Sequence, residues 1–396
     1  VSDSLNLALN KAAAGATAYG TVVAANVETI AITSFDQVAA GSTAAVDTLT
    51  LTASAAKTIT VAGNNGLTIA GGAALTSFDA SGVVANGTAD TAALLAVTFT
   101  NGNSTTAATI TGGDGNDVLT GNVKADTISG GAGIDYIYGD NAGNKEVQTI
   151  TLTHVAAVAG SVKINGITVA FTGGADATAD ATALTTAINA KAELKGLVSA
   201  TSALGVVTVT SLTDGDLTAS TVVDASAATG VIATTTAGTA GTTAVDSLNG
   251  GAGADVLVGG GGADTLTGGA GVDNFFFLKA HSTLAATATI TDFTFVTSGT
   301  SNDKLILGDQ VAAIGTSTTV QDLSTAVSIQ AAIDTAATTN VVNNGLSVFI
   351  WGGNTYAYVE TTGSGTSYVS TDFIVKLTGL PLAAGATIAG SGFDAV

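Results

Sequence analysis

Short runs of apolar and β-branched residues, separated by glycine, asparagine and aspartate, make up the first 110 residues of the chain. The clearest runs are residues 28–33, 48–52, 58–62, 67–70 and 95–100. Runs of this length, bounded by turn-forming residues, predict short strands joined by turns. Residues 1–110 are therefore expected to form an irregular β-solenoid, although the pattern also allows a β-sandwich.

A stricter pattern, with a period of nine residues, occupies residues 111–146 and 241–280. From position 112 the sequence reads GGDGNDVLT, GNVKADTIS, GGAGIDYIY and GDNAGNKEV; from position 241 it reads GTTAVDSLN, GGAGADVLV, GGGGADTLT and GGAGVDNFF. Glycine fills most of places one, two and four, and a large apolar residue fills place eight. The sixth-place aspartates are Asp117, Asp126, Asp135, Asp246, Asp255, Asp264 and Asp273.

Each nine predicts a glycine-rich turn followed by a very short strand. Glycine accepts the left-handed backbone conformations of tight turns, and the eighth residue points inward from the strand. Such units wind into a parallel β-roll with two nines per coil, so turns on the same side lie 18 residues apart in sequence. This stacks Asp246 over Asp264 and Asp255 over Asp273.

The first block is expected to end within its fourth nine. There Asn144 and Glu146 stand where aspartate and an apolar residue belong. On this interpretation Asp117 and Asp135 form the firmer upstream pair, and Asp126 has no matching partner.

Stacked carboxylates repel one another unless a cation lies between them. A hard divalent ion held by carboxylates and by carbonyl oxygens of the glycine turns would remove this repulsion. Calcium accepts such an irregular oxygen cage more readily than magnesium does. The expected ligands are the seven sixth-place aspartates and the carbonyls of glycines at places two and four: Gly113, Gly115, Gly131, Gly133, Gly251, Gly253, Gly260, Gly262, Gly269 and Gly271.

The nines resemble the RTX (repeats-in-toxin) calcium-binding repeat, GGxGxDxUx, which forms a β-roll. Ordering nine backbone residues costs roughly 9 to 18 kcal/mol, whereas burying one leucine returns only about 1.5 to 3 kcal/mol. The roll is therefore expected to be disordered without Ca²⁺. Calcium sites of extracellular modules bind at about 0.1 to 1 mM, so such sites fill outside the cell.

Residues 147–235 do not show the nine-residue pattern of the two blocks. The alternating segments VQTITLTHV and SVKINGITVAF predict a hairpin, for which Asn165-Gly166 offers a turn. A helix capped by Asp180, with Leu184, Ala187 and Ile188 on one face, should follow. Two further strands, at residues 197–201 and 206–211, complete a small ββαββ-like inserted domain, for which a spacer or lattice contact is the first hypothesis.

Residues 281–396 resemble the cap and the C-terminal type I secretion signal of RTX proteins. The segments ITDF (290–293) and DKL (303–305) are similar to those that pack over the open end of an RTX roll, where Asp292 and Asp303 could complete a site. A helix at residues 320–337 and strands SVFIW, TYAYVE and DFIVKL are expected to follow. The whole chain is thus expected to be mainly β: a β-roll or β-solenoid with a small inserted α+β domain and a β-rich cap.

Composition narrows the function classes. The chain carries 30 acidic and 10 basic residues, a net charge of −20, which argues against nucleic-acid binding. It has no cysteine, so stability outside the cell must come from metal, packing or lattice contacts. No apolar run is long enough for a transmembrane segment. The start lacks an initiator Met and a secretory signal pattern, which is compatible with a fragment, a processed chain or type I export.

No catalytic constellation is evident. The two histidines, His154 and His281, belong to no HExxH motif, no GxSxG elbow occurs, and no GK[ST] follows the glycine-rich segments. Trp351 with its aromatic neighbours could form a sugar platform, but a hairpin core is the favoured interpretation. A non-enzymatic protein is therefore expected.

The leading hypothesis, by resemblance to RTX surface-layer proteins, is a secreted structural protein that assembles with Ca²⁺ into a lattice of identical copies on a bacterial cell. The expected partners are further copies, the type I export machinery and a cell-surface polysaccharide bound through an upstream region. The alternative is the C-terminal export and folding module of a larger RTX adhesin or hydrolase. A free calcium buffer is the third and least favoured reading.

Overall fold

The structure is a computed structural model. It describes residues 2–11, 16–36, 46–70, 74–87, 90–103, 105–141, 143–154, 159–165, 167–191, 194–214, 221–224, 228–239, 241–278, 281–294, 303–307, 317–339, 346–360, 368–370, 372–380, 382, 384–385, 387–389 and 393–395.

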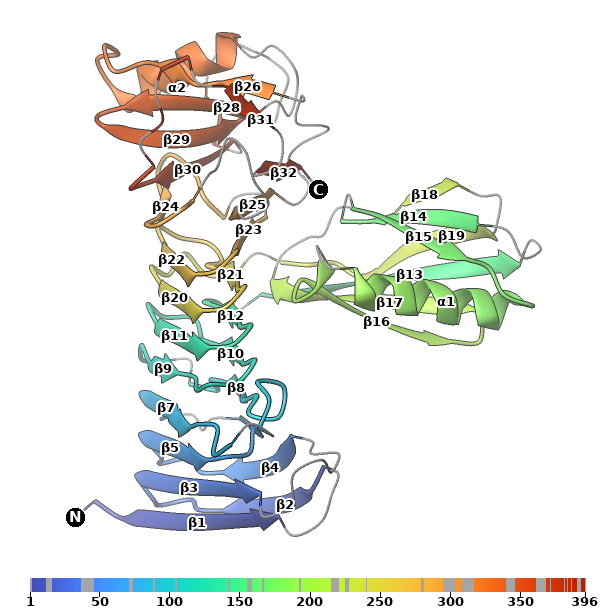
Figure 1. The fold of residues 1–396 in the computed structure, drawn as a ribbon, viewed down its shortest axis with the longest axis vertical. Helices are drawn as coiled ribbons and strands as arrows, with labels where there is room; N and C mark the ends of the chain where they lie inside the picture. The colour runs from blue at the N-terminus through green and yellow to red at the C-terminus, as the bar shows by residue number, and fades with distance from the viewer. Residues whose placement is uncertain are drawn as a thin grey trace.

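Two long sheets run along the molecule and enclose a common core (Figure 1). Consecutive strands alternate between the sheets, so the chain winds as a coil. In order along the first sheet its strands are β1 (Ser4–Lys11), β3 (Thr29–Asp36), β5 (Thr58–Gly63), β7 (Ser77–Val83), β9 (Thr109–Thr111), β11 (Thr127–Ala132), β20 (Ser247–Ala252), β22 (Thr265–Ala270), β24 (Ala288–Ile290), β30 (Phe373–Leu377), β29 (Asn354–Val359), β28 (Leu346–Trp351) and β27 (Gln321–Asp322).

The second sheet faces the first across the core. Its strands are β2 (Ala18–Val23), β4 (Asp47–Thr52), β6 (Leu67–Ala70), β8 (Thr98–Thr100), β10 (Val118–Thr120), β12 (Tyr136–Tyr138), β21 (Val256–Val258), β23 (Asn274–Phe277), β25 (Lys304–Leu307) and β32 (Phe393–Ala395). Neighbouring coils of the roll pair in parallel, for example Leu248 with Leu266. The predicted fold class, a parallel β-roll within a mainly β chain, is confirmed, and residues 1–110 wind in the same two sheets.

The eighth residue of each nine fills the interior of the roll. Leu119, Leu257 and Phe275 from the second sheet and Leu248 and Leu266 from the first are all 0–1% exposed. These side chains form one hydrophobic cluster that extends from the first coils to the C-terminal strands. Each coil therefore packs on its neighbours and cannot bury its apolar residue alone.

The two nonapeptide blocks form one uninterrupted roll. β11 pairs in parallel with β20, and β12 pairs with β21, although 120 residues separate partners such as Thr127 and Ser247. Partners elsewhere in the roll, such as Ser247 and Thr265, are 18 residues apart. The difference, 102 residues, is the length of an insertion within a single nine.

The prediction that the first block ends its roll in the fourth nine is therefore wrong. Gly139 and Asp140 are places one and two of a nine that resumes at Thr243 and continues through Asp246 to Asn249. Without the insertion this nine reads GDTAVDSLN. The insertion, residues 141–242, is wider than the predicted 147–235, and Asn144 and Glu146 belong to it.

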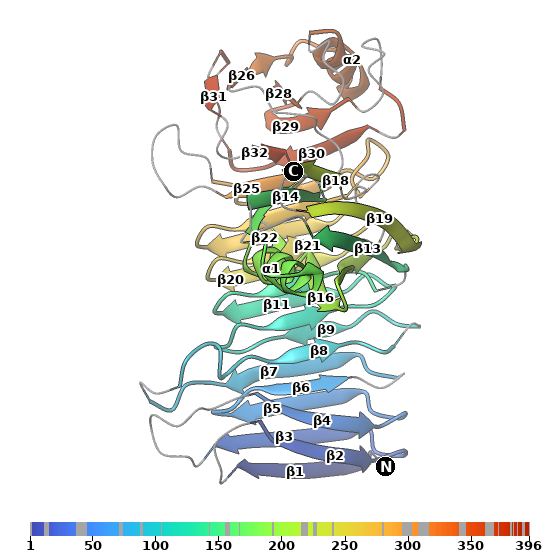
Figure 2. The same ribbon diagram turned by 90° about the vertical axis from the view of Figure 1, so that its right-hand side faces the viewer.

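The insertion forms a separate α+β unit that projects from the side of the roll (Figures 1 and 2). One antiparallel sheet has the order β16-β17-β13-β19 and a smaller one the order β15-β14-β18. Helix α1 packs on β15 and β16. The elements are β13 (Lys145–His154), β14 (Ala159–Ile164), β15 (Ile167–Thr172), α1 (Ala177–Ala190), β16 (Val198–Ala203), β17 (Val206–Asp214), β18 (Thr221–Asp224) and β19 (Ala228–Thr236).

The predicted hairpin of the insertion is present as β14 and β15, with Asn165 at φ 48° in the turn; Gly166 lies outside the described residues. The predicted helix face is also present, since Leu184 and Ile188 are buried. The N-cap differs from the prediction. Asp176 caps α1 by accepting from Ala179 N, because Asp180 already lies in the first turn of the helix.

Beyond the last nine, β24 and β25 extend the two sheets by one further coil. The strands β30, β29 and β28 then continue the first sheet, and helix α2 (Ile329–Thr339) covers β28. β26 (Ser317–Thr319) and β31 (Thr387–Ala389) form a separate pair. Trp351 belongs to the β28–β29 hairpin and packs near Tyr356, with ring centroids 6.5 Å apart, in agreement with the hairpin-core interpretation.

The outer faces of the two sheets differ. On the first sheet, places seven and nine hold polar residues such as Thr127, Ser129 and Asn249. On the second sheet the same places hold Tyr138, Val256, Val258 and Phe276, among others, which pack in one cluster with the apolar residues of the insertion. The second sheet is therefore the docking face of the insertion.

Deletion of residues 141–242 should leave a roll that still folds with Ca²⁺. The deletion joins Asp140 to Thr243 and restores a continuous nine, so every coil keeps its neighbours. A calcium titration followed by circular dichroism should show the strand signal appearing with an unchanged midpoint. Solubility should fall, because the apolar docking face becomes exposed. Loss of the calcium response would contradict the assignment of a split repeat.

Candidate metal centre

The sixth-place aspartates form two rows, one along each edge of the roll. The row that precedes the second-sheet strands contains Asp117, Asp135, Asp255 and Asp273; the row that precedes the first-sheet strands contains Asp126, Asp246 and Asp264. All seven side chains are 0–1% exposed. The structure thus places the predicted aspartates in stacked rows, as their spacing indicated.

One carboxylate oxygen of each aspartate is held by the backbone of the preceding coil. Oδ1 of Asp264 accepts from Asp246 N at 2.9 Å, and Oδ1 of Asp246 accepts from Asp126 N at 2.7 Å. In the other row, Asp255 N donates to Asp273 Oδ1 at 2.9 Å and Asp135 N donates to Asp255 Oδ1 at 2.8 Å. The stacking of Asp246 over Asp264 and Asp255 over Asp273 is confirmed.

The expectation that Asp126 lacks a partner is wrong. Its backbone N–H donates to Asp246 Oδ1, because the two blocks meet directly in space. Asp135 likewise has a partner in Asp255 as well as in Asp117, whose N–H donates to Asp135 Oδ1 at 2.7 Å. The insertion therefore interrupts the sequence of the rows but not the rows themselves.

The second carboxylate oxygen has no partner in the middle of the rows. Among the described residues, Oδ2 of Asp135, Asp246, Asp255 and Asp264 is buried and accepts no hydrogen bond. A buried carboxylate oxygen without a partner is strongly destabilising unless a proton or a cation compensates it. These four atoms form two stacked pairs, Asp135 with Asp255 and Asp246 with Asp264.

Glycine at place one lets a carbonyl oxygen approach the carboxylates of Asp135, Asp246 and Asp255. A methyl group built on Gly250 would lie nearer than 3.0 Å to both Asp255 Oδ2 and the carbonyl oxygen of Gly268. The same holds at Gly139, against Asp246 Oδ2 and the carbonyl oxygen of Gly259. Only glycine leaves room for this convergence of oxygens. Calcium prefers such a set of carboxylate and carbonyl oxygens, so the residues present fit the ion.

The first-place glycines were not among the predicted ligands. The sequence did carry a signal for them, because glycine occupies place one in all seven nines of the roll. These glycines are Gly112, Gly121, Gly130, Gly139, Gly250, Gly259 and Gly268. The carbonyls of the glycines at places two and four stay a prediction as ligands, and in the structure these glycines also allow the coils to stack closely. Gly253, with φ 155°, lies so close to the carbonyl oxygen of Gly133 that a side chain would overlap it, and Gly113 O accepts from Ala132 N at 2.9 Å.

Ordinary hydrogen bonds replace the cation at the ends of the rows. Asp117 Oδ2 accepts from Gly113 N at 2.7 Å, and Asp126 Oδ2 accepts from Asn122 N at 2.5 Å. Asp303 continues one row by accepting from Asp273 N, but its Oδ2 accepts from Thr294 N at 2.6 Å. Asp292 binds Gly268 N and Gly269 N with its two oxygens. The demand for a cation is thus concentrated in the middle of the roll.

Asp47 provides an internal comparison. It stands in register with Asp117 three coils further along, and its Oδ1 accepts from Thr17 N at 2.7 Å in the same way. Its Oδ2, however, accepts from the side-chain amide of Asn65 at 2.8 Å. A neutral donor therefore does here what a cation would do in the nonapeptide rows.

Burial raises the pKa of every sixth-place aspartate. The pKa of Asp135 and of Asp246 rises to about 8, with neighbouring carboxylates adding to the effect of burial. The pKa of Asp273 rises to about 7, and that of Asp117, Asp255 and Asp264 to about 6; the pKa of Asp126 is also raised. At neutral pH Asp135 and Asp246 therefore favour either a bound proton or a bound cation.

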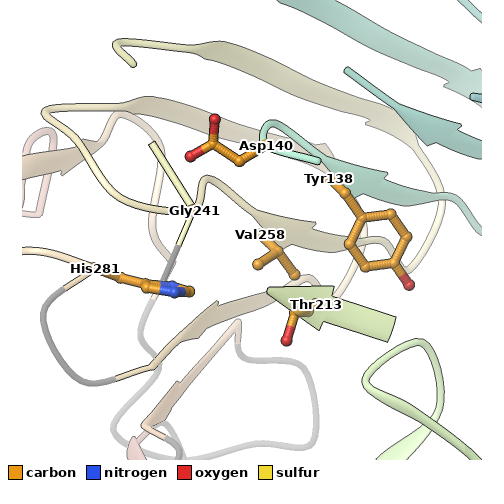
Figure 3. Close-up of a pocket in the computed structure, with 7 residues that line it drawn as sticks. Tyr138, Asp140, Thr213, Gly241, Val258 and His281 are labelled. Carbon is orange, nitrogen blue, oxygen red and sulfur yellow. The ribbon is translucent and has the colours of Figure 1, made fainter. Parts of the chain in front are cut away.

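A small cavity lies where the insertion meets the roll (Figure 3). Tyr138, Asp140 and Val258 line it from the roll, Thr213 from β17 and His281 from the segment after the last nine. Its volume is about 10 Å³, room for a single water molecule. Asp140 Oδ1 accepts from Thr242 Oγ1 at 2.7 Å, which ties the two ends of the insertion together.

The histidines do not come together in a site. His154 Nδ1 lies 2.8 Å from Asp180 Oδ2 within the insertion, whereas His281 accepts from Leu278 N at the base of the cavity. Within the described part of the chain, no three His, Cys, Asp or Glu side chains gather to hold a metal by themselves. A cation in the rows would thus rely on backbone carbonyls as well as on aspartates.

Residues 111–144 and 241–275 match the family model of the RTX calcium-binding nonapeptide repeat, in four copies. A search of curated proteins gives no match to the chain. The matched segments are the ones that form the aspartate rows, and nonapeptides of this family are calcium-binding motifs. None of the helices that the structure describes is long and apolar enough to cross a bilayer.

Replacing Asp264 or Asp255 by alanine should raise the calcium concentration needed to fold the roll by about 10- to 100-fold, because each change removes an oxygen pair from a row. A calcium titration followed by circular dichroism measures the midpoint. Asp47→Asn is the matched control: it changes a stacked, buried aspartate whose Oδ2 already has an amide partner. An unchanged midpoint in both alanine variants would refute the ligand assignment.

Without metal, low pH should favour the folded roll. The folded-state pKa values of the row aspartates lie above their unfolded values, so the free energy of folding is most favourable at low pH and this contribution is lost as pH rises through about 6 to 8. Circular dichroism in a chelator at pH 5, 6.5 and 8 should therefore show the strongest strand signal at pH 5. All three values lie above the isoelectric point of about 4.1.

The double change Asp135→Asn with Asp246→Asn should flatten the same pH trend, because a neutral amide replaces the two carboxylates with the most strongly raised pKa. Saturating Ca²⁺ should flatten it in the unchanged protein. A metal-free roll whose stability rises from pH 5 to pH 8 would contradict the electrostatic account of the rows.

Proposed function

We propose that this chain, with its RTX calcium-binding repeats, is a secreted structural protein whose roll folds outside the cell and whose copies assemble into a bacterial surface layer. The observation that carries the proposal is the set of buried carboxylate oxygens without partners in the middle of the roll. A fold that needs a divalent cation at its core is suited to a calcium-rich exterior and to a roll that stays unfolded before export.

The shape of the molecule supports a structural role. The roll is long, its two sheets run from the first to the last coil, and a separate unit projects from its side (Figure 1). Coils that contact only their neighbours give a stiff rod that grows by repetition. The projecting unit offers a second direction for contacts between copies. Such a rod with an arm is suited to building a two-dimensional array.

Charge supports a calcium-dependent contact between copies. The net charge of −20 makes copies repel one another in the absence of a counterion. Calcium bound between acidic surfaces would lower this repulsion in addition to folding the roll. The further partners in this proposal are the type I export machinery and a cell-surface polysaccharide bound through an upstream region.

Calcium titration of the purified chain tests the proposal, with strand content followed by circular dichroism and particle size by light scattering. The strand signal and large ordered assemblies should both appear at about 0.1 to 1 mM Ca²⁺. Neither should appear with Mg²⁺ at the same concentration. Electron microscopy of the assemblies should show a regular array. A chain that folds with Ca²⁺ but stays monomeric would instead favour an export and folding module of a larger secreted adhesin or hydrolase.

A further inference from the structure

The insertion enters the roll inside a repeat that takes part in an aspartate row. Gly139 and Asp140 precede the insertion, and Asp246 follows it, yet they form one turn. Gly139 N donates to Val258 O at 2.9 Å, and Asp246 receives the N–H of Asp126 on its Oδ1. Closing this turn brings the two stems of the insertion side by side.

The same turn holds one of the partnerless oxygens. Asp246 Oδ2 is buried beside Gly139, which precedes the insertion, and Asp246 stacks on Asp264, whose Oδ2 is also buried without a partner. The site around this oxygen is therefore formed from both sides of the 102-residue insertion: Gly139 precedes the insertion, whereas Asp246 and the carbonyl oxygen of Gly259 follow it. A cation bound at this turn would close the stems as well as neutralise the carboxylates.

The surface on which the insertion docks also comes from both sides of it. Tyr136 and Tyr138 on β12 precede the insertion, whereas Val256, Val258 and Phe276 on β21 and β23 follow it. The Tyr138 hydroxyl donates to Gly196 O of the insertion, and the Tyr136 ring lies against Gly196. This composite surface exists only when the roll is continuous across the split repeat.

The insertion itself does not depend on the aspartate rows. Its strands pair with one another, as β13 does with β17 and β19, and α1 packs on its own strands. Leu152, Val169, Leu184 and Val207 of the insertion are at most 4% exposed, and they belong to a cluster in which the residues of the insertion outnumber those of the roll. No sixth-place aspartate lies within the insertion. It can therefore keep its fold while the roll around it is unfolded.

We propose that Ca²⁺ controls the placement of the insertion: the metal-free chain carries a folded arm on two loose stems, and calcium binding at the split repeat fixes the arm on the second sheet. This inference rests on calcium binding by the repeats, a part of the proposed function, but not on assembly into a layer. It makes the arm a calcium-dependent contact element that is presented in a fixed direction only outside the cell.

Distances between two spin labels test the placement of the arm. The chain has no cysteine, so Val84→Cys on the roll and Leu204→Cys at the β16–β17 turn, 44% and 92% exposed, give two unique label sites. Pulsed electron paramagnetic resonance should give a broad distance distribution in a chelator and a single narrow one with Ca²⁺. A narrow distribution in the chelator would overturn the proposal.

Asp246→Asn should abolish the narrow peak at a calcium concentration at which circular dichroism shows strand signal. The matched control is Asp273→Asn, which changes a buried sixth-place aspartate whose neighbouring coils both follow the insertion. This control should keep the narrow peak. A narrow peak in Asp246→Asn, or loss of the peak to the same extent in both variants, would count against the split-repeat site.

Hydrogen exchange separates the calcium-dependent folding of the roll from the calcium control of the arm. Amides of β13 and β17 should be protected with and without Ca²⁺, whereas amides of β20 to β23 should gain protection only with it. If calcium gives no gain in β20 to β23, the calcium-dependent fold and this inference both fail. If the gain occurs but the label distance stays the same, only the calcium control of the arm fails. Loss of protection in β13 without calcium would also overturn the independent arm.

Discussion

A buried carboxylate has two oxygens to satisfy, and in this roll the backbone satisfies only one of them. The N–H of the sixth residue in one coil reaches Oδ1 of the aspartate in the next, so the ladder of coils and the ladder of carboxylates are the same structure. Oδ2 then needs another source of positive charge. A buried Oδ2 without a partner would destabilise the fold by several kcal/mol per site, which is more than the burial of one leucine contributes. The stability of the roll therefore depends on a cation.

The ends of the roll show how the same geometry works without a cation. Asn65 supplies an amide to Asp47, and Thr294 supplies an N–H to Asp303. Each arrangement uses one particular neighbour and closes the row at that point. A cation, by contrast, is held by backbone carbonyls of the glycine turns. A cation site can therefore recur from coil to coil. Neutral partners terminate the rows and calcium extends them, which makes only the middle of the solenoid sensitive to its surroundings.

Much of this organisation could be predicted from the sequence because the period of nine is strict. The coil of two nines, the inward eighth residue and the stacks of Asp246 on Asp264 and Asp255 on Asp273 follow from spacing alone. The continuity of the two blocks could not be read in the same way, because Gly139-Asp140 keeps only two places of its nine before the insertion begins. The cap of α1 was assigned to Asp180 because sequence alone does not separate an N-cap from a first-turn aspartate four residues later.

The strand residues at places seven and nine indicate which sheet is covered by the insertion, whereas the turn residues do not. They are threonine, serine or asparagine along β11, β20 and β22, but tyrosine, valine or phenylalanine along much of β12, β21 and β23. Outward apolar residues on one sheet require a cover, and the cover has to lie on that sheet. The insertion leaves the roll directly after β12, a strand of that sheet, and is therefore the nearest cover. Since its landing surface combines strands from both blocks, the insertion and the roll depend on the same closed turn, and the metal that closes the turn sets the geometry of both.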